Sequence, residues 1–533
     1  MEKKLAGLLA LLLALFGPPE RGYAEPVFRT SDRCLACHNG LTTLSGRDVS
    51  IGTEWRSSIM ANSSRDPYWQ AGVRRETIDH PTEARDIEDE CSVCHMPVPR
   101  QQAKAHGQPG EVFAYLPFVE HLSDSAAAAD GVTCSVCHQI QKQNLSTRAS
   151  FNGGFTVESR AEQKARAEYG PFVIDAGRQH IMETSTAGFQ PTAAQHIRDS
   201  ALCATCHQLY TTARGKGGKA IGSLPEQMPY LEWLHSDYAD GMSCQQCHMP
   251  EVKEAVSISS VLGVLREGLH QHLFVGANFA MASLLNRYRT ELDVAALPLE
   301  LTSTTDQTLS LLHASAASLE LKSVEVVSSR LEAEVVVGNL TGHKLPTAYP
   351  SRRAWLHFVV RDRADKTVFE SGRLNSDGSI QGNDNDADPS RFEPHYREIT
   401  RGEQVQIYES ILRDSEGRVT TGLLAAVGFL KDNRLLPSGF DKATAEKDIA
   451  VVGDAAQDPD FLGGLDHVRY AVPINAADGP FHVKVELWYQ PIGFRWAHNL
   501  DRYDAAETRR FVGFYTSMSE STGTVLADAQ ATR

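Results

Sequence analysis

The chain has 533 residues, which is more than one hydrophobic core usually organises, so the sequence predicts at least two domains. Its 67 acidic residues outnumber its 52 basic residues and give a formal net charge of −15. Binding to a phosphate backbone needs clustered lysine and arginine, so this charge balance argues against nucleic acid as a partner. A protein partner of complementary charge is compatible with it.

The first 24 residues have the pattern of an export signal. Two lysines within Met1–Lys4 precede an apolar run over Leu5–Phe16, and Gly22-Tyr23-Ala24 offers small residues at the positions that a signal peptidase reads. The apolar run is too short to span a bilayer comfortably, and no later segment is a second candidate. We therefore expect a mature chain that begins near Glu25, has no transmembrane segment and is periplasmic or extracellular.

Five copies of Cys-x-x-Cys-His follow, and together they use all ten cysteines of the chain. This spacing is typical of covalent c-type haem attachment, in which two thiols bind one haem edge and the adjoining histidine coordinates the iron. Zinc sites or disulfides would not explain a histidine after every second cysteine. The sequence predicts five haems c, attached at Cys34 and Cys37, Cys91 and Cys94, Cys134 and Cys137, Cys203 and Cys206, and Cys244 and Cys247, with proximal ligands His38, His95, His138, His207 and His248.

The stretch that holds the motifs is irregular and rich in glycine and proline turns, for instance over Phe151–Phe155 and Gly215–Gly222. Short helical patterns alternate with these turns. We expect residues 25–300 to form a multihaem cytochrome domain, in which short helices and loops wrap haems that themselves form the core.

Each motif after the first has a histidine 7 to 13 residues upstream. Low-spin haem iron commonly takes imidazole as its second axial ligand, so these residues are candidate distal ligands that would tie successive haems together. The alternative is a surface or propionate-binding role. The four candidates are His80, His121, His196 and His235.

Two further residues are candidate iron ligands. His272 lies in Leu269–Phe274, just before the expected helix that closes this domain, and we favour it over His270. Met60 lies between the first two motifs among aromatic residues, and a thioether ligand would raise the potential of its haem. Simple packing of Met60 against a porphyrin is an equally open interpretation.

After about residue 300 the pattern changes to alternating apolar and polar residues, as over Leu331–Val337 and His482–Tyr489. We expect residues 301–533 to form an all-β, sandwich-like domain. Its seven histidines show no ligand spacing that would predict a separate metal site. His343 differs, because Gly342 and Pro346 bracket it in a fixed loop from which it could reach a haem at the domain junction.

Several segments resemble secreted multihaem c-type cytochromes related to the tetrahaem cytochrome c of nitrifying bacteria. The resemblance covers most of the mature chain and implies electron transfer through closely packed haems. The nitrifier cytochrome has four motifs and no comparable β extension, so its partner is not carried over. Besides the motifs, the matching segments are Arg65–Tyr68, Pro229–His235, His272 with Phe274–Asn278, Gly342–Thr347, Pro350–Trp355 and Lys431–Pro437.

These features predict an exported pentahaem c-type cytochrome that carries electrons between redox proteins or quinol-linked membrane complexes. The β domain could also serve in docking or oligomer formation. The alternative is an oxidoreductase with one open haem that acts on nitrite, hydroxylamine or a similar small nitrogen compound. Pentahaem nitrite reductases typically replace one motif histidine by lysine, whereas all five motifs here end in histidine, so the sequence favours a carrier and names no catalytic residue.

Overall fold

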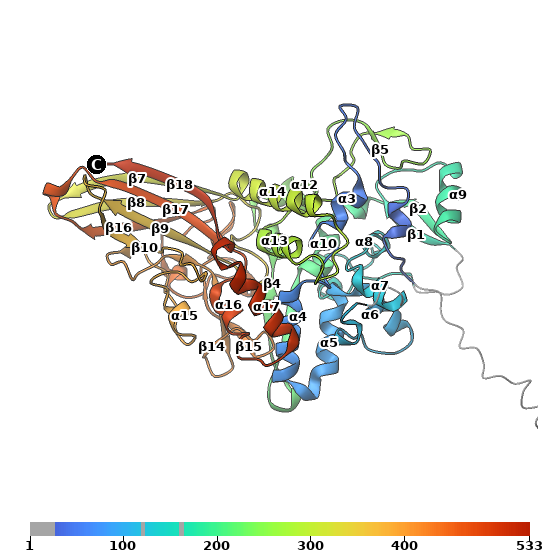
Figure 1. Ribbon diagram of the computed structural model, residues 1–533, viewed down its shortest axis with the longest axis horizontal. Helices are drawn as coiled ribbons and strands as arrows, with labels where there is room; N and C mark the ends of the chain where they lie inside the picture. The colour runs from blue at the N-terminus through green and yellow to red at the C-terminus, as the bar shows by residue number, and fades with distance from the viewer. Residues whose placement is uncertain (1–26, 119–122, 159–164) are drawn as a thin grey trace, which may run out of the picture.

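The computed structural model describes residues 27–118, 123–158 and 165–533. The predicted export signal lies outside these residues. The molecule is elongated, with long strands at one end and short helices and loops at the other (Figure 1). Within the described residues, no helix is both long enough and apolar enough to cross a membrane.

Short helices build the end of the molecule that holds the motifs. Four of the motif segments are the last residues of a helix, so each of α5, α8, α10 and α12 ends at its motif histidine. The helices are α2 (Asp32–Leu35), α3 (Ile51–Arg56), α4 (Pro67–Asp79), α5 (Ala84–His95), α6 (Pro97–Ala105), α7 (Ser123–Ala129), α8 (Cys134–His138), α9 (Ala176–Ser185), α10 (Ser200–His207), α11 (Pro229–Leu234) and α12 (Cys244–His248).

Three small two-stranded sheets connect these helices. One is parallel and pairs β1 with β2, and the other two are antiparallel and pair β3 with β4 and β5 with β6. Their strands are β1 (Arg166–Gly170), β2 (Phe189–Ala193), β3 (Leu209–Arg214), β4 (Ala220–Gln227), β5 (Val256–Ser257) and β6 (Leu265–Arg266).

The chain after residue 316 is rich in β-strands, as the alternating pattern predicted. One sheet has the order β10-β9-β17-β18 with β12 paired to β9, a second has the order β11-β16-β8-β7, and a third has the order β14-β13-β15. The strands are β7 (Ala317–Val327), β8 (Arg330–Asn339), β9 (Arg353–Arg361), β10 (Thr367–Ser371), β11 (Glu398–Ile399), β12 (Ile407–Tyr408), β13 (Ser410–Asp414), β14 (Val419–Thr420), β15 (Ala426–Asp432), β16 (Leu465–Pro473), β17 (His482–Gln490) and β18 (Thr524–Thr532).

The two larger sheets share one buried core. Every second residue of β8 is buried, and the side chains of Leu331, Val335 and Val337 pack in the same cluster as Val485 and Leu487 from β17. Alternation with period two places these side chains on one face of each strand. The apolar residues that the pattern singled out therefore form the contact between the two sheets.

The strand-rich part also packs closely against the motif-bearing part. Helix α17 (Ala506–Ser517) lies against α4, where the rings of Tyr68 and Phe511 are 4.8 Å apart and Arg74 pairs with Glu507 at 2.9 Å. Helices α13 (Phe279–Arg287) and α14 (Pro298–Ser315) lie between the two ends, and α16 (Phe494–His498) lies near α17 (Figure 1). The predicted boundary after residue 300 falls inside α14, which runs on into β7.

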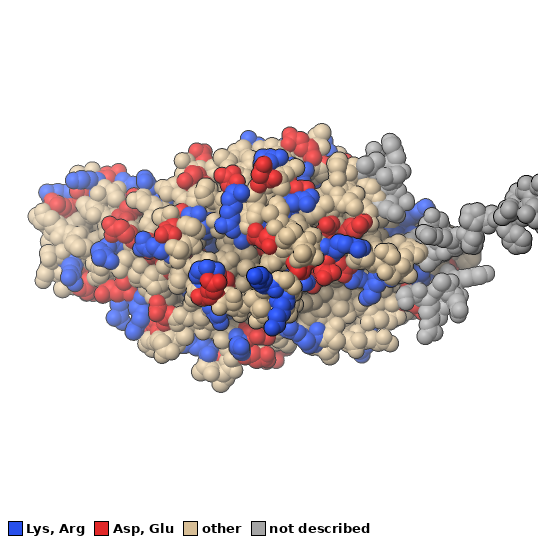
Figure 2. All heavy atoms as spheres, turned by 90° about the horizontal axis from the view of Figure 1, so that it is seen from below, with Lys and Arg blue, Asp and Glu red and all other residues tan. Residues whose placement is uncertain are grey.

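The surface charge is mixed in the view of Figure 2, where acidic and basic side chains alternate over the visible face. The net charge of −15 is therefore not gathered into one acidic patch on that face.

Candidate functional site

One large cavity collects the motif residues. Its volume is about 1850 Å³ and most of its lining is apolar. All ten cysteines and all five motif histidines border it, although they come from segments spread over more than 200 residues of sequence. A cavity of this size exceeds the range of about 300 to 1000 Å³ that is usual for one small-molecule site.

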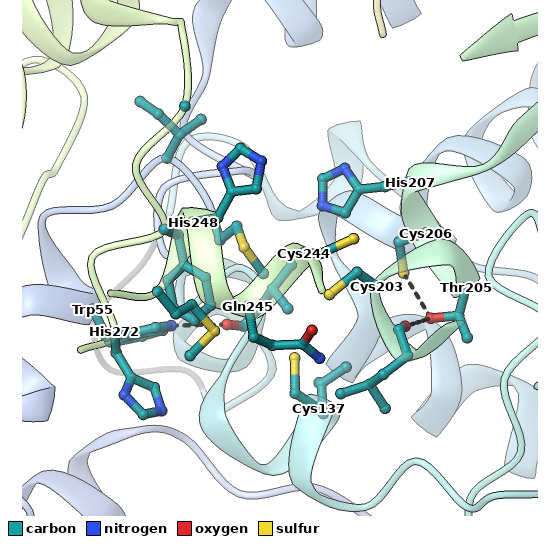
Figure 3. A pocket seen from close by; sticks show the side chains of 18 of the residues that line it. Trp55, Cys137, Cys203, Thr205, Cys206, His207, Cys244, Gln245, His248 and His272 are labelled. Atoms are coloured by element: carbon teal, nitrogen blue, oxygen red, sulfur yellow. Dashed lines mark hydrogen bonds between the residues drawn. The ribbon is translucent and has the colours of Figure 1, made fainter. Parts of the chain in front are cut away.

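The motif helices present their side chains to this cavity. Residues three and four apart lie on the same face of a helix, so Cys-x-x-Cys-His directs two thiols and one imidazole to one side. Capping residues fix where these helices start: Thr133 accepts a hydrogen bond from the Ser135 amide, and Asp199 accepts one from the Ala201 amide. Figure 3 shows the side chains of Cys203, Cys206, His207, Cys244 and His248 gathered around one space.

The order of the motifs in space differs from their order in sequence. Thiols of different motifs are close neighbours in three pairs, which join Cys34 with Cys134, Cys94 with Cys206 and Cys203 with Cys244. The first motif therefore lies beside the third, the second beside the fourth, and the fourth beside the fifth. Burial and the neighbouring Cys206 thiol raise the pKa of Cys137 to about 12, which also places the third motif near the fourth.

Backbone carbonyls orient most of the motif histidines. A metal-binding histidine usually donates its second ring N–H to such a partner, which fixes the tautomer and leaves the other nitrogen for the metal. Here the Nδ1 atoms of four motif histidines lie within hydrogen-bond distance of a carbonyl oxygen. The pairs are His38 with Ile258 at 2.6 Å, His95 with Ser63 at 3.2 Å, His138 with Tyr169 at 2.6 Å and His248 with Val275 at 2.5 Å.

Two motif histidines face a second imidazole across the cavity. The rings of His138 and His272 have their centres 6.4 Å apart and lie 18° from parallel, and those of His248 and His343 are 6.4 Å apart and 12° from parallel. One metal ion held by two ring nitrogens at about 2 Å each separates the ring centres by about 6 Å. Both pairs therefore have the spacing of two axial ligands of one iron.

Burial keeps the facing imidazoles neutral. It lowers the pKa of His272 to about 3 and the pKa of His343 to about 4, and in each case the facing motif histidine lowers it further. Neutral imidazole is the form that coordinates a metal. The Nδ1 atom of His272 lies 3.1 Å from the His270 carbonyl oxygen, and that of His343 lies 3.0 Å from the Lys344 carbonyl oxygen. Four of the motif histidines have the same kind of contact with a backbone carbonyl.

The upstream histidines lie elsewhere. His80, His196 and His235 do not border the cavity, and His121 lies outside the described residues. The Nε2 of His196 is 2.8 Å from the Ile140 carbonyl oxygen. His235 has its Nδ1 2.8 Å from the Leu231 carbonyl oxygen and its Nε2 3.9 Å from Glu446. We therefore propose no iron-binding role for the three described histidines, because all of them lie away from the cavity that collects the motifs.

Met60 and His270 both border the cavity. The sequence favours His272 over His270, yet His270 Nδ1 lies 2.6 Å from the Met249 carbonyl oxygen, in the arrangement of the motif histidines. Sequence distance gave no way to separate His270 from His272. The tertiary signal that separates them is the facing ring, which His272 has in His138.

A second cluster of candidate metal ligands lies in the strand-rich part, where His395, Asp458 and Asp466 are buried close together. The side-chain amides of Gln406 and Asn433 both donate to His395 Nδ1, at 2.9 and 3.1 Å. The Nε2 atom must then carry the ring proton, and it lies 3.2 Å from Asp458. Hydrogen bonds thus occupy both ring nitrogens, and this donor set does not fit a metal ion.

Comparisons with known proteins support the fold. The chain is similar to the crystal structure of a penta-heme cytochrome c552 from Thermochromatium tepidum, with a TM-score of 0.51 and 15% sequence identity over 96% of this chain and 100% of that one. No family model matches the sequence, and no curated protein matches it. The similarity covers both the motif-bearing part and the strand-rich part.

Proposed function

We propose that this chain is an exported pentahaem c-type cytochrome that carries electrons between redox partners. The observation that carries the proposal is the convergence of all five Cys-x-x-Cys-His motifs on one apolar cavity. Haem iron supplies a reversible one-electron change when it is bound. The similarity in fold to a penta-heme cytochrome supports the same conclusion.

The protein's own residues have three tasks in this function. The ten cysteines would hold the five haems by thioether bonds, and the five motif histidines would bind the irons, most of them with Nδ1 anchored on the backbone. His272 would be the second axial ligand of the haem at His138, while Met60 stays a candidate ligand at the cavity wall. The apolar walls exclude water and so help to set the reduction potentials.

Electron exchange with a partner needs a haem edge near the surface. Among the ten cysteines, all of which the structure describes, Cys247 alone is exposed, and Val261 and Val264 are exposed while also bordering the cavity. The amide of Ser260, next to Val261, donates to the carbonyl oxygen of Cys37 in the first motif at 2.8 Å. These positions would bring the fifth and the first haem closest to solvent. We propose that redox proteins or quinol-linked membrane complexes in the periplasm or outside the cell dock there.

The test is an intact-mass measurement of the protein matured in a host that attaches haem c, together with its absorption spectrum. We expect the mass of the chain from about Glu25 plus five haems, and a Soret band that shifts on reduction. A mature protein without added haem mass or without a Soret band would overturn the proposal.

A second candidate function, reaction of a small nitrogen compound at one haem, is favoured by a buried acidic pair beside the second motif. Glu76 and Glu226 border the cavity near Cys91, and burial raises the pKa of both carboxyl groups. Glu76 Oε2 has no hydrogen-bond partner among the described residues. A carboxylic acid near an iron with an open position could donate the protons that reduction of nitrite consumes.

Ligand binding separates this function from electron transfer alone. Nitrite, hydroxylamine or cyanide should change the ferric spectrum if one haem has an open position. A fully low-spin ferric spectrum that none of the three changes would remove the second candidate.

A further inference from the structure

The fifth motif faces a residue from the strand-rich part of the chain. His343 lies in the loop between β8 and β9, and its imidazole faces that of His248 with ring centres 6.4 Å apart and planes 12° from parallel. The spacing equals that of the His138 and His272 pair. Both members of the pair border the same cavity, and each has Nδ1 beside a carbonyl oxygen, Val275 for His248 and Lys344 for His343.

Direct stacking does not explain this pair. Stacked rings in contact lie much closer, as do Tyr288 and Phe514 at 3.7 Å between centres. At 6.4 Å two nearly parallel imidazoles leave room between them for one ion bound to both at about 2 Å. Since each Nδ1 lies beside a carbonyl, the Nε2 atoms are the ones left to bind it.

We propose that His343 is the distal axial ligand of the haem attached at Cys244 and Cys247, so that the strand-rich part completes one of the haem sites. The inference rests on the proposed function, since it needs a haem at the fifth motif. It assigns this haem two imidazole ligands, one from the motif-bearing part and one from the strand-rich part.

A buried ionic network holds the His343 loop against the motif-bearing part. Glu232 of α11 accepts hydrogen bonds from the Lys344 amide at 3.2 Å and from the Thr347 hydroxyl. Arg434 pairs with Glu232 at 3.0 Å. Asp432 then pairs with Arg434 at 2.7 Å and with the Lys344 ammonium at 2.8 Å.

All four charged groups of this network are at least nine-tenths buried. A buried charge that loses its partner is strongly destabilising, so the network resists movement of the loop. Glu232 belongs to the segment just before the fifth motif, whereas Lys344 is the neighbour of His343. The network therefore fixes the distance between His343 and His248, and Glu232 is a positioning residue.

The first experiment compares His343→Ala with the wild type and with His313→Ala, all as haem-loaded full-length protein. His313 is an exposed histidine near the start of the strand-rich part, bonded to Thr524. We expect His343→Ala to convert one haem from low spin to high spin in the ferric electron paramagnetic resonance spectrum, and added imidazole to restore it. His313→Ala should match the wild type.

A second variant, His343→Met, keeps the test decisive if His343→Ala fails to fold. It keeps a ligand at the position, so one haem should stay low spin, rise in midpoint potential and gain the near-infrared band of methionine-ligated ferric haem. Glu232→Gln should shift the potential of the same haem and leave the others unchanged. A purely structural role of Glu232 would lower the unfolding temperature and leave every potential unaltered.

The outcome separates this inference from the proposed function. If the wild type lacks haem, the proposed function fails. If the wild type carries five haems and His343→Ala and His343→Met both keep its spin state and its midpoint potentials, the proposed function stands and His343 is not a ligand.

Discussion

At the scale of single residues, orientation decides which histidines can bind iron. His196 and His272 are both histidines of the motif-bearing part, and the two differ in where their ring nitrogens point. The Nε2 of His196 is taken by the Ile140 carbonyl, whereas His272 faces His138 across the cavity. His196 does not border the cavity, so we expect it to contribute to packing and not to iron binding.

This difference predicts opposite results for two alanine variants. His272→Ala should convert one haem to high spin, because it removes the ring that faces His138. His196→Ala should leave the spin state unchanged. Ferric electron paramagnetic resonance of the two haem-loaded proteins checks both. High-spin signal in His196→Ala, or its absence in His272→Ala, would contradict the assignment.

A second prediction at this scale concerns Asp466. Burial raises its pKa to about 7, while Tyr408 and Gln406 donate to one of its oxygens. Between its unfolded pKa of about 4 and pH 7 the folded state holds a proton that the unfolded state releases, so this contribution to stability falls as pH rises and is constant above about 7. Over that range each step of one pH unit lowers the free energy of unfolding by about 1.4 kcal/mol.

Asp466→Asn cannot ionise and should lose that pH dependence. The unfolding temperature of Asp466→Asn relative to the wild type should therefore rise from pH 5 to pH 8, by the equivalent of about 2 to 4 kcal/mol. Burial lowers the pKa of His395 to about 4, so its ring is neutral in the folded wild type from pH 5 to pH 8. Thermal unfolding at the two pH values measures this rise, and an equal difference at both would show that Asp466 stays ionised.

At the scale of elements, the loop between β8 and β9 is fixed by charges that come from three places in the sequence. Glu232 comes from α11, Lys344 from the loop itself and Asp432 from the end of β15. Burial alone would raise the pKa of Asp432, but Arg434 and Lys344 hold it well below its usual value. The carboxylate therefore stays charged and bridges the two cations.

Removal of this bridge should be costly. Asp432→Ala leaves Lys344 and Arg434 without their shared partner, and we expect it to lower the free energy of unfolding by about 3 to 5 kcal/mol. Glu416→Ala is the matched control, because Glu416 pairs with Arg418 on the exposed surface and its loss should cost less than about 1 kcal/mol. Chemical denaturation of both variants checks the contrast, which equal effects would refute.

At the scale of the whole molecule, the described residues of the motif-bearing part form several small apolar clusters around one large cavity. Its side chains border a cavity of about 1850 Å³, whereas the strand-rich part has a close-packed core of apolar residues from two sheets. Apolar walls around so large a space are stable only when something apolar fills it. The two parts should therefore depend on haem to different degrees.

The full chain produced without haem attachment tests this difference. We expect rapid proteolysis between residues 27 and 290 and slow proteolysis between residues 317 and 532. Mass spectrometry of the fragments locates the cleavage sites. The haem-loaded protein is the control and should resist cleavage in both regions. Equal resistance of both regions in the haem-free chain would contradict a core made of haem.

The local chemistry and the broad layout could be predicted from the amino-acid pattern alone. The Cys-x-x-Cys-His spacing places its thiols and imidazole on one side of a single helical turn. The alternation over Leu331–Val337 indicates which side of a strand is buried. Both predictions depend only on local sequence. The short helices around the motifs and the strand-rich C-terminal part were predicted on this basis, and both are present.

Which motifs are neighbours and which histidines face each other could be read only from the folded chain. The first motif lies beside the third, and His343 meets His248 although helices α13 and α14 and strands β7 and β8 lie between them in sequence. Such contacts depend on how distant elements pack. Proximity along the chain, on which the candidates His196 and His235 were based, carries no information about that packing. Facing pairs are a property of the folded cavity because two ligands of one iron must approach from opposite sides.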